Sequence, residues 1–205
     1  KNALWIDPKN TLVLFKLGNT LALADSRNFE DAANCYKKVI QIDPNNVSAY
    51  SALGDLSSKQ QNYNEAAENY RKVIQINPKD ASVLTRLGDM LTKLKKYEEA
   101  IDYYKKAIQI DPQNVYVYSS LGDALYNLQR YEEAVENYKN ALRIDPKNVK
   151  ALLGLVILSY ELKKNVQNNL QNVSVFKDFG EAFIYIGKYQ EAIDNFEKVI
   201  QIDPK

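Results

Sequence analysis

Every proline of this 205-residue chain stands in the same context, after an isoleucine and then an aspartate or asparagine. The six positions are Pro8, Pro44, Pro78, Pro112, Pro146 and Pro204, and successive prolines are separated by 36, 34, 34, 34 and 58 residues. Five of the seven glycines recur in the same register, namely Gly18, Gly54, Gly88, Gly122 and Gly180. Self-similarity at a period near 34 residues is typical of stacked repeats, in which each unit buries its apolar face against its neighbours.

Within one period the apolar pattern is helical. Leucines mark one face of a first helix, here termed A, at Leu84, Leu87, Leu91 and Leu94. A second amphipathic stripe over residues 97–108 predicts a helix B, which ends at the proline because proline lacks an N–H group. A glycine inside helix A costs about 1 kcal/mol relative to alanine, so its recurrence predicts a neighbouring helix that approaches too closely for a β-carbon.

The fixed positions identify a known repeat pattern. When each unit is numbered so that the glycine is position 8 and the proline position 32, position 20 is Ala32, Ala66, Ala100, Ala134 and Ala192. Position 24 is Tyr36, Tyr70, Tyr104, Tyr138 and Phe196. These residues resemble the tetratricopeptide repeat family. The resemblance implies an all-α, right-handed superhelical solenoid whose A helices line a concave groove, and a protein-binding function without catalytic residues.

The repeat frame predicts the unit boundaries. We expect residues 1–10 to end a preceding helix B, and full units at 11–46, 47–80, 81–114, 115–148 and 173–205. The unit at 149–172 is shortened; its helix over 151–162 is apolar almost all round and is expected to be buried on most sides. Neither end carries a polar capping helix, so we expect the chain to be part of a longer array.

Composition excludes several functional classes. The net charge of +1 argues against a nucleic-acid module, and no apolar run is long enough to span a membrane. The chain has no histidine and a single cysteine, which excludes His-dependent nucleophiles and His-ligated metals within it. We therefore expect no catalytic residues, no metal and no cofactor. One unpaired cysteine favours a reducing compartment, and we expect a cytoplasmic location.

A row of polar side chains is predicted on the groove side of the A helices, at position 9. Its members are Asn19, Asp55, Asp89, Asp123, Ile157 and Glu181. Packed helices lie about 8–10 Å apart, so neighbouring carboxylates are too far apart to share a metal ion. Two interpretations remain: a ladder that accepts hydrogen bonds from a peptide or attracts basic residues, or an ordinary solvated helix face.

Four tyrosines outside the repeat framework form a second candidate set, Tyr116, Tyr126, Tyr160 and Tyr185. Tyrosines are common anchors in protein interfaces, although packing around the shortened unit would also account for them. The two-carboxylate clamp of chaperone-adaptor members of the family is not matched. Of its five positions only Asn19 and Arg86 agree, and both lysines are absent, so an acidic C-terminal chaperone tail is not expected. Arg86 remains a groove candidate.

The predicted function is a non-catalytic scaffold that holds a peptide or helical segment of a protein partner in the groove. The acidic row predicts a partner with basic or hydrogen-bond-donor character. Two alternatives remain: a regulatory or substrate-presenting region of a larger enzyme such as a glycosyltransferase, or a structural subunit of a large assembly.

Overall fold

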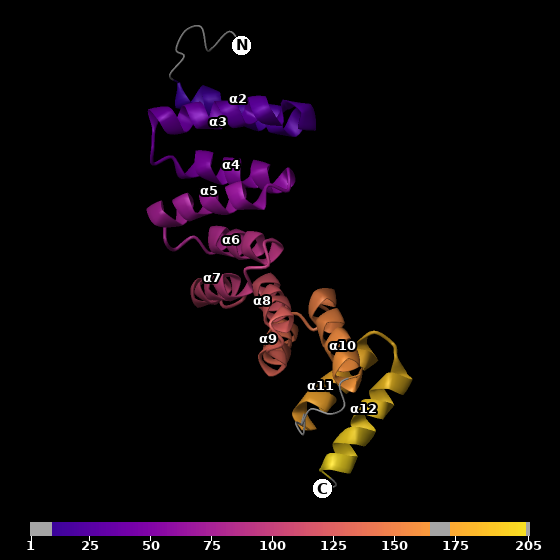
Figure 1. The fold of residues 1–205 in the computed structure, drawn as a ribbon. Helices are drawn as coiled ribbons and strands as arrows, with labels where there is room; N and C mark the ends of the chain where they lie inside the picture. The colour runs from indigo at the N-terminus through magenta and orange to yellow at the C-terminus, as the bar shows by residue number, and fades with distance from the viewer. Residues whose placement is uncertain (1–9, 165–172, 204–205) are drawn as a thin grey trace. The chain divides into compact units, whose positions relative to one another are not determined.

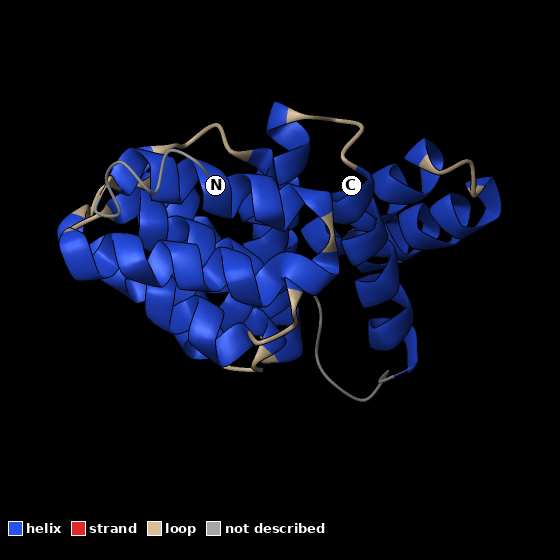
Figure 2. Ribbon diagram, turned by 90° about the horizontal axis from the view of Figure 1, so that it is seen from above, coloured by secondary structure: helices blue, strands red, loops and turns tan. Residues whose placement is uncertain are grey.

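The computed structural model describes residues 10–164 and 173–203, and within these residues the fold is helical. Eleven α-helices and one 3-10 helix are joined by short turns in this part of the chain (Figure 2). Their bounds are α2 (Thr11–Ala24), η1 (Ser26–Asn28), α3 (Phe29–Ile42), α4 (Val47–Lys59), α5 (Tyr63–Ile76), α6 (Ala81–Lys93), α7 (Tyr97–Ile110), α8 (Val115–Asn127), α9 (Tyr131–Ile144), α10 (Val149–Lys164), α11 (Val173–Tyr185) and α12 (Tyr189–Ile202).

The helices form two compact units, and the boundary between them falls inside α7, after Tyr103. In the first unit α2 pairs with α3 and α4 with α5, while α3 packs on α4 and α5 on α6 (Figure 1). In the second unit α8 pairs with α9 and α11 with α12, and α10 packs on both α8 and α9. The prediction of an all-α array of helical hairpins is confirmed. The expected helix B at residues 1–10 lies outside the described residues, except for residue 10.

The A helices begin at the residue type that best caps them. The side chains of Asn10, Asn46, Asp80, Asn114 and Asn148 each accept a hydrogen bond from the backbone N–H three residues later. These bonds satisfy N–H groups that have no partner within the helix. The B helices end just before the proline, where residues such as Asp43 and Asp145 adopt extended backbone. The Asp-Pro…Asn segment is therefore the joint between successive hairpins.

In the first hairpin the 3-10 helix η1 joins the two helices, whereas each later pair of A and B helices is joined by a turn with one left-handed residue at position 15. That residue is Gln61, Lys95, Gln129 or Gly187, with φ values of 60°, 60°, 59° and 75°. The backbone N–H of the next residue reaches back to the carbonyl five residues earlier, as in Asn62 to Ser57 at 2.8 Å. This is the Schellman arrangement, which satisfies the last carbonyls of helix A.

The recurring glycine is explained by an aromatic ring rather than by a close helix backbone. A β-carbon on Gly54 would lie 2.5 Å from the ring of Tyr70, and one on Gly122 would lie 2.6 Å from the ring of Tyr138. These tyrosines occupy position 24 of helix B in the same hairpin and are almost fully buried. The neighbouring helix is close, as expected, but it is the ring at position 24 of helix B that contacts helix A at the glycine.

The shortened unit agrees with the prediction in part. Its helix α10 is longer than expected, but it is buried on most sides, as expected: among residues 151–160 only Leu153, Ile157 and Tyr160 are exposed. Together with Val149, which is 67% exposed, these residues form one narrow exposed strip along the helix. Among the described residues α10 has no B helix of its own. Instead α11 packs against it and also contacts α9. Residues 165–172 lie outside the described part.

Candidate protein-binding face

The position-9 row is engaged by the buried tyrosines of the same hairpins. The Tyr36 hydroxyl donates to Asn19 Oδ1 at 2.8 Å, and the Tyr70 hydroxyl donates to Asp55 Oδ1 at 2.7 Å. In the second unit the Tyr138 hydroxyl donates to Asp123 Oδ1 at 2.7 Å. Burial raises the pKa of Tyr70 and Tyr138 far above the ordinary value, so both hydroxyls stay protonated donors. The side chains at position 9 therefore accept the hydrogen bonds that the hydroxyl groups of these buried tyrosines donate.

A cation from the following A helix also compensates the carboxylates. Arg86 on α6 forms an ion pair with Asp55 on α4. Lys150 on α10 pairs with Asp123 on α8, with 3.0 Å between Nζ and Oδ2. Asn19 has no charge to compensate, and the position equivalent to Arg86 in the next helix is Ala52. Asp55 and Asp123 are therefore locally neutralised, which weakens the expectation of a row that attracts a basic partner.

The structure places the remaining members of the row in differing surroundings. Asn19 and Asp55 line one hollow of about 240 Å³ in the first unit. Asp89 is half-buried on α6 and has an interaction partner within the described chain. Glu181 on α11 is exposed and lies 3.9 Å from Lys177. The row is therefore a set of separately paired side chains, and only Ile157 breaks its polar character.

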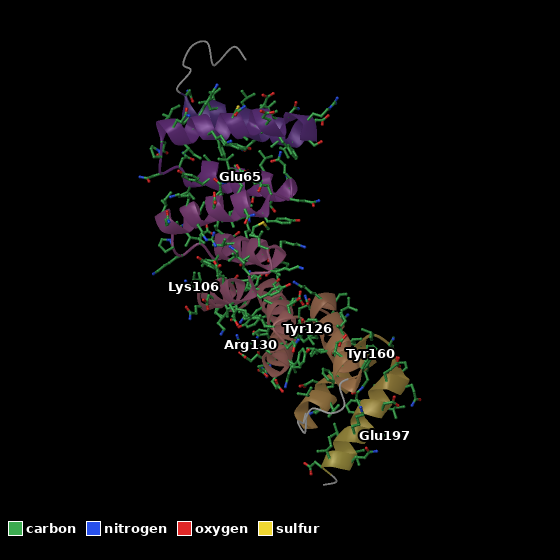
Figure 3. The ribbon with its side chains drawn as sticks, viewed as in Figure 1. Glu65, Lys106, Tyr126, Arg130, Tyr160 and Glu197 are labelled. Atoms are coloured by element: carbon green, nitrogen blue, oxygen red, sulfur yellow. The ribbon has the colours of Figure 1, made fainter. Side chains whose placement is uncertain are left out.

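The four tyrosines differ in exposure. Tyr116 and Tyr185 are 50% and 57% exposed, and Tyr160 is 43% exposed. Tyr126 is half-buried, and its ring centroid lies 6.0 Å from that of Tyr131. Figure 3 shows Tyr126 on α8 and Tyr160 on α10. Tyr126 therefore serves mainly as packing, whereas the other three present aromatic surface to solvent.

Two of the exposed tyrosines carry a lysine beside the ring. Lys150 Nζ lies 4.9 Å from the centroid of Tyr116, so one lysine contacts both Tyr116 and Asp123. Lys188 Nζ lies 3.2 Å from the Tyr160 hydroxyl, and Phe183 packs edge-on against the Tyr160 ring at 5.8 Å. These contacts fix the orientation of both rings, and a rigid aromatic surface loses little conformational entropy on binding.

An exposed apolar row on α10 was missed by the sequence reasoning. Val149, Leu153, Ile157 and Tyr160, here termed the α10 stripe, lie on one side of the helix and are between 43% and 67% exposed. Leu153, Ile157 and Tyr160 occupy positions 5, 9 and 12, which in α4 and α6 are serine, threonine or aspartate. The sequence shows that apolar residues replace polar ones at these positions, but it does not show that their side chains are exposed.

Two hollows lie beside α10 in the second unit, and only the first of them is lined by residues of the α10 stripe. One, of about 330 Å³, is lined by Lys147, Val149, Leu152, Leu153, Tyr185 and Ile186. The other, of about 250 Å³, has charged walls that include Lys139, Arg143 and Asp178, and it also reaches Tyr185. Burial raises the pKa of Asp178, although Lys139 Nζ lies 3.0 Å from its carboxylate and acts in the opposite direction.

No site for metal chemistry is evident in the residues that the structure describes. There, no group of three acidic or cysteine side chains is placed to hold an ion. No helix in the same ranges is long and apolar enough to cross a bilayer. What the described residues offer a ligand is a helix face with aromatic and aliphatic side chains.

The hairpin array and its exposed A-helix face define a repeat scaffold. Family models agree: one described as TPR repeat matches residues 88–129 and 122–160, and one described as tetratricopeptide repeat matches residues 178–205. Residues 25–107 match the model of subunit 3 of the anaphase-promoting complex, or cyclosome. The chain belongs to the tetratricopeptide repeat family. A search of curated proteins finds no sequence match.

Several solved structures of tetratricopeptide repeat proteins have a similar fold. MamA is 22% identical, with a TM-score of 0.65 over 95% of this chain and 92% of that chain. YrrB, described as a TPR protein with an unusual peptide-binding site, is 19% identical, with a TM-score of 0.64 over 100% and 92%. PilF of Pseudomonas aeruginosa is 22% identical, with a TM-score of 0.63 over 95% and 92%. At these identities the likeness concerns the fold.

Proposed function

We propose that the protein is a non-catalytic scaffold that binds a peptide or helical segment of another protein on the A-helix face of its second unit. The fold is of a type that typically serves protein–protein interaction. The observation that supports this face is the α10 stripe, an apolar surface whose members Leu153, Ile157 and Tyr160 occupy positions that are polar in α4 and α6. Exposed apolar patches bordered by polar residues mark interaction sites in soluble proteins.

The surroundings of the stripe support the same proposal. Tyr160 is held by Lys188 and Phe183, and Tyr116 is held by Lys150, so the aromatic surface is preorganised. Interface energy usually concentrates in a few aromatic and aliphatic anchors that a partner covers. The position-9 carboxylates contribute less than expected, because Asp55 and Asp123 already have a tyrosine and a cation as partners.

Site-specific photo-cross-linking tests this proposal. A photoreactive amino acid at Ile157 of the full-length protein, in its native cells, is expected to capture a defined protein that mass spectrometry identifies. The matched control is Ile76, which is 39% exposed at the end of α5, whereas Ile157 is 49% exposed. Equal capture of the same proteins at both positions, or none at Ile157, would contradict the proposal.

A second candidate function is that of a structural subunit in a larger assembly. It is favoured by the outer face of α12, where Ile193 is 47% exposed although the equivalent Val135 on α9 is 4% exposed. The match of residues 25–107 to a subunit of a large complex points in the same direction. In this case the partner would be another helical array that packs against α12.

A further inference from the structure

The α10 stripe occupies helix positions that a neighbour covers in α8. Positions 1, 5, 9 and 12 of α8 carry Val115, Ser119, Asp123 and Tyr126, and none of these four residues is exposed. The same positions of α10 carry the four members of the stripe, each of which is at least 43% exposed. Because the register is the same, the difference arises from what lies over each helix.

The cover over α8 is the following A helix, which is α10 itself. The Ser119 hydroxyl donates to Oδ1 of Asn148, the residue before α10, at 3.0 Å. Lys150 Nζ lies 3.0 Å from Asp123 Oδ2 and donates to Ser120 Oγ at 2.8 Å. Two consecutive A helices thus lie side by side, and the second covers positions 5 and 9 of the first.

Within residues 10–164 and 173–203, no helix covers α10 in this manner. The next A helix, α11, follows α10 without an intervening helix B in that part of the chain, and it packs against α9 as well as α10. Lys139 Nζ on α9 lies 3.0 Å from Asp178 Oδ2 on α11, which holds α11 toward helix B of the preceding hairpin. The place over the stripe is therefore open from Val149 to Tyr160, a length of about 16 Å or three turns of helix.

The stripe and the covered face of α8 differ in the contacts that they can make. Leu153 stands where α8 has Ser119, and Ile157 stands where α8 has Asp123. Neither aliphatic side chain can accept a hydrogen bond, so a lysine at the place that Lys150 takes over α8 would be buried without a partner, which is unfavourable. Aliphatic side chains one turn apart would instead bury apolar area against Leu153 and Ile157. The open place therefore fits the apolar face of an amphipathic helix.

The described cations that border the stripe have acidic partners within the chain. Lys150 is paired with α8, and Lys188 Nζ lies 3.4 Å from Glu191 Oε1. Lys147 is balanced by Asp145, whose carboxylate accepts a hydrogen bond from the Lys147 backbone N–H at 3.0 Å. These cations favour no acidic occupant, so apolar contact decides what binds.

We infer that the α10 stripe binds an amphipathic helix of a partner protein, which takes the place over α10 that α10 takes over α8 and meets Leu153 and Ile157 with aliphatic side chains. This inference rests on the proposed function and adds the conformation and the contact chemistry of the partner segment. The partner helix completes a pair of adjacent A helices that the shortened unit leaves incomplete in the described residues. Its anchors follow the spacing of one helix face, as in other complexes in which a helix binds an apolar surface.

Three synthetic peptides of about 15 residues, long enough to span the stripe, test the inference. The first has leucines at i, i+4 and i+8 of a helix built from alanine and glutamine. The second has alanine in place of the leucines, and the third keeps the leucines but has a central proline, which breaks the helix. In fluorescence anisotropy with the full chain, the first peptide is expected to bind at least about tenfold tighter than either of the others. Raising the salt concentration should change its affinity by less than about twofold, because no ion pair forms on binding.

Two variants of the chain locate the binding site. Leu153→Ser combined with Ile157→Asp gives α10 the residue types of α8 at positions 5 and 9, and should weaken the leucine peptide by at least about tenfold. Ile157→Ser alone is milder and should weaken it by about threefold. The matched control is Ile76→Ser, at a site 39% exposed at the end of α5, which should leave the affinity unchanged. Circular dichroism should show the same helix content in all variants, because the substituted side chains are exposed.

Several outcomes would overturn the inference. Equal binding of the proline peptide would mean that the occupant is extended, and failure of all three peptides, or binding that the stripe variants do not weaken, would remove the site. Sedimentation velocity should show no association that depends on Ile157. A dimer that Ile157→Ser dissociates would make the occupant a second copy of this chain. The scaffold function is judged separately by cross-linking at Ile157, which captures a partner whether or not its segment is helical.

Discussion

The contact between Gly54 and Tyr70 sets how closely helices A and B approach within a hairpin. A β-carbon on Gly54 would lie 2.5 Å from the ring, and the ring has no room to move because Tyr70 is 2% exposed and its hydroxyl is held by Asp55. Gly54→Ala should therefore lower the free energy of unfolding by about 1–2 kcal/mol through overpacking, although alanine is the better helix former by about 1 kcal/mol. Urea unfolding followed by circular dichroism measures the difference.

The same substitution in a second background tests the cause. With Tyr70→Leu the ring is gone, and Gly54→Ala should then be neutral or stabilising, because only the helix propensity remains. An alanine that stabilises the chain with Tyr70 in place would show that ring contact does not explain the glycine. The tyrosine at position 24 was visible in the sequence as core, but its contact with the glycine was not, since sequence spacing does not give side-chain direction.

At the scale of the helical hairpin, the turn between A and B is strained wherever position 15 is not glycine. Gln61 has a φ of 60°, a region in which a β-carbon is unfavourable, whereas Gly187 fills the same position with a φ of 75°. Gln61→Gly should raise the free energy of unfolding by about 0.5–1 kcal/mol, measured by chemical denaturation. The neighbouring Gln60, with a φ of −79°, is the control, and Gln60→Gly should lower the free energy of unfolding by about the same amount. If both substitutions change the free energy of unfolding in the same direction, the explanation from turn geometry is contradicted.

The elements themselves were predictable because their signals are local. Proline ends each B helix, and asparagine or aspartate caps the next A helix, as at Asn46 and Asp80. The exposure of α10 was not predictable, because a helix that is apolar all round does not reveal which of its faces a neighbour covers. The same limit applies to the row at position 9: the spacing put Asp55 and Asp123 on one face, but the pairing with Arg86 and Lys150 depends on the next helix.

At the scale of the whole molecule, stability and association both depend on which helix faces are covered by a neighbouring repeat. Ala67 on α5 and Val135 on α9 are 1% and 4% exposed at position 21. At the same position on α12, Ile193 is 47% exposed, and Tyr189 and Ile200 beside it are 66% and 64% exposed. The face of α12 that carries Ile193 is thus exposed, whereas the same face of α5 and α9 is buried. Stacked repeats gain most of their stability from contacts between neighbouring repeats through such faces.

Association through this face follows if the protein is a subunit of an assembly. The chain should then self-associate or bind another array in a concentration-dependent manner, and Ile193→Glu should abolish the association by placing a charge on the apolar surface. Sedimentation velocity over a range of concentrations measures this. Ile42→Glu, at a site 41% exposed at the end of α3, is the matched control and should leave the association intact. A strictly monomeric protein, or equal loss in both variants, would exclude α12 as the contact and leave the α10 stripe as the interaction surface.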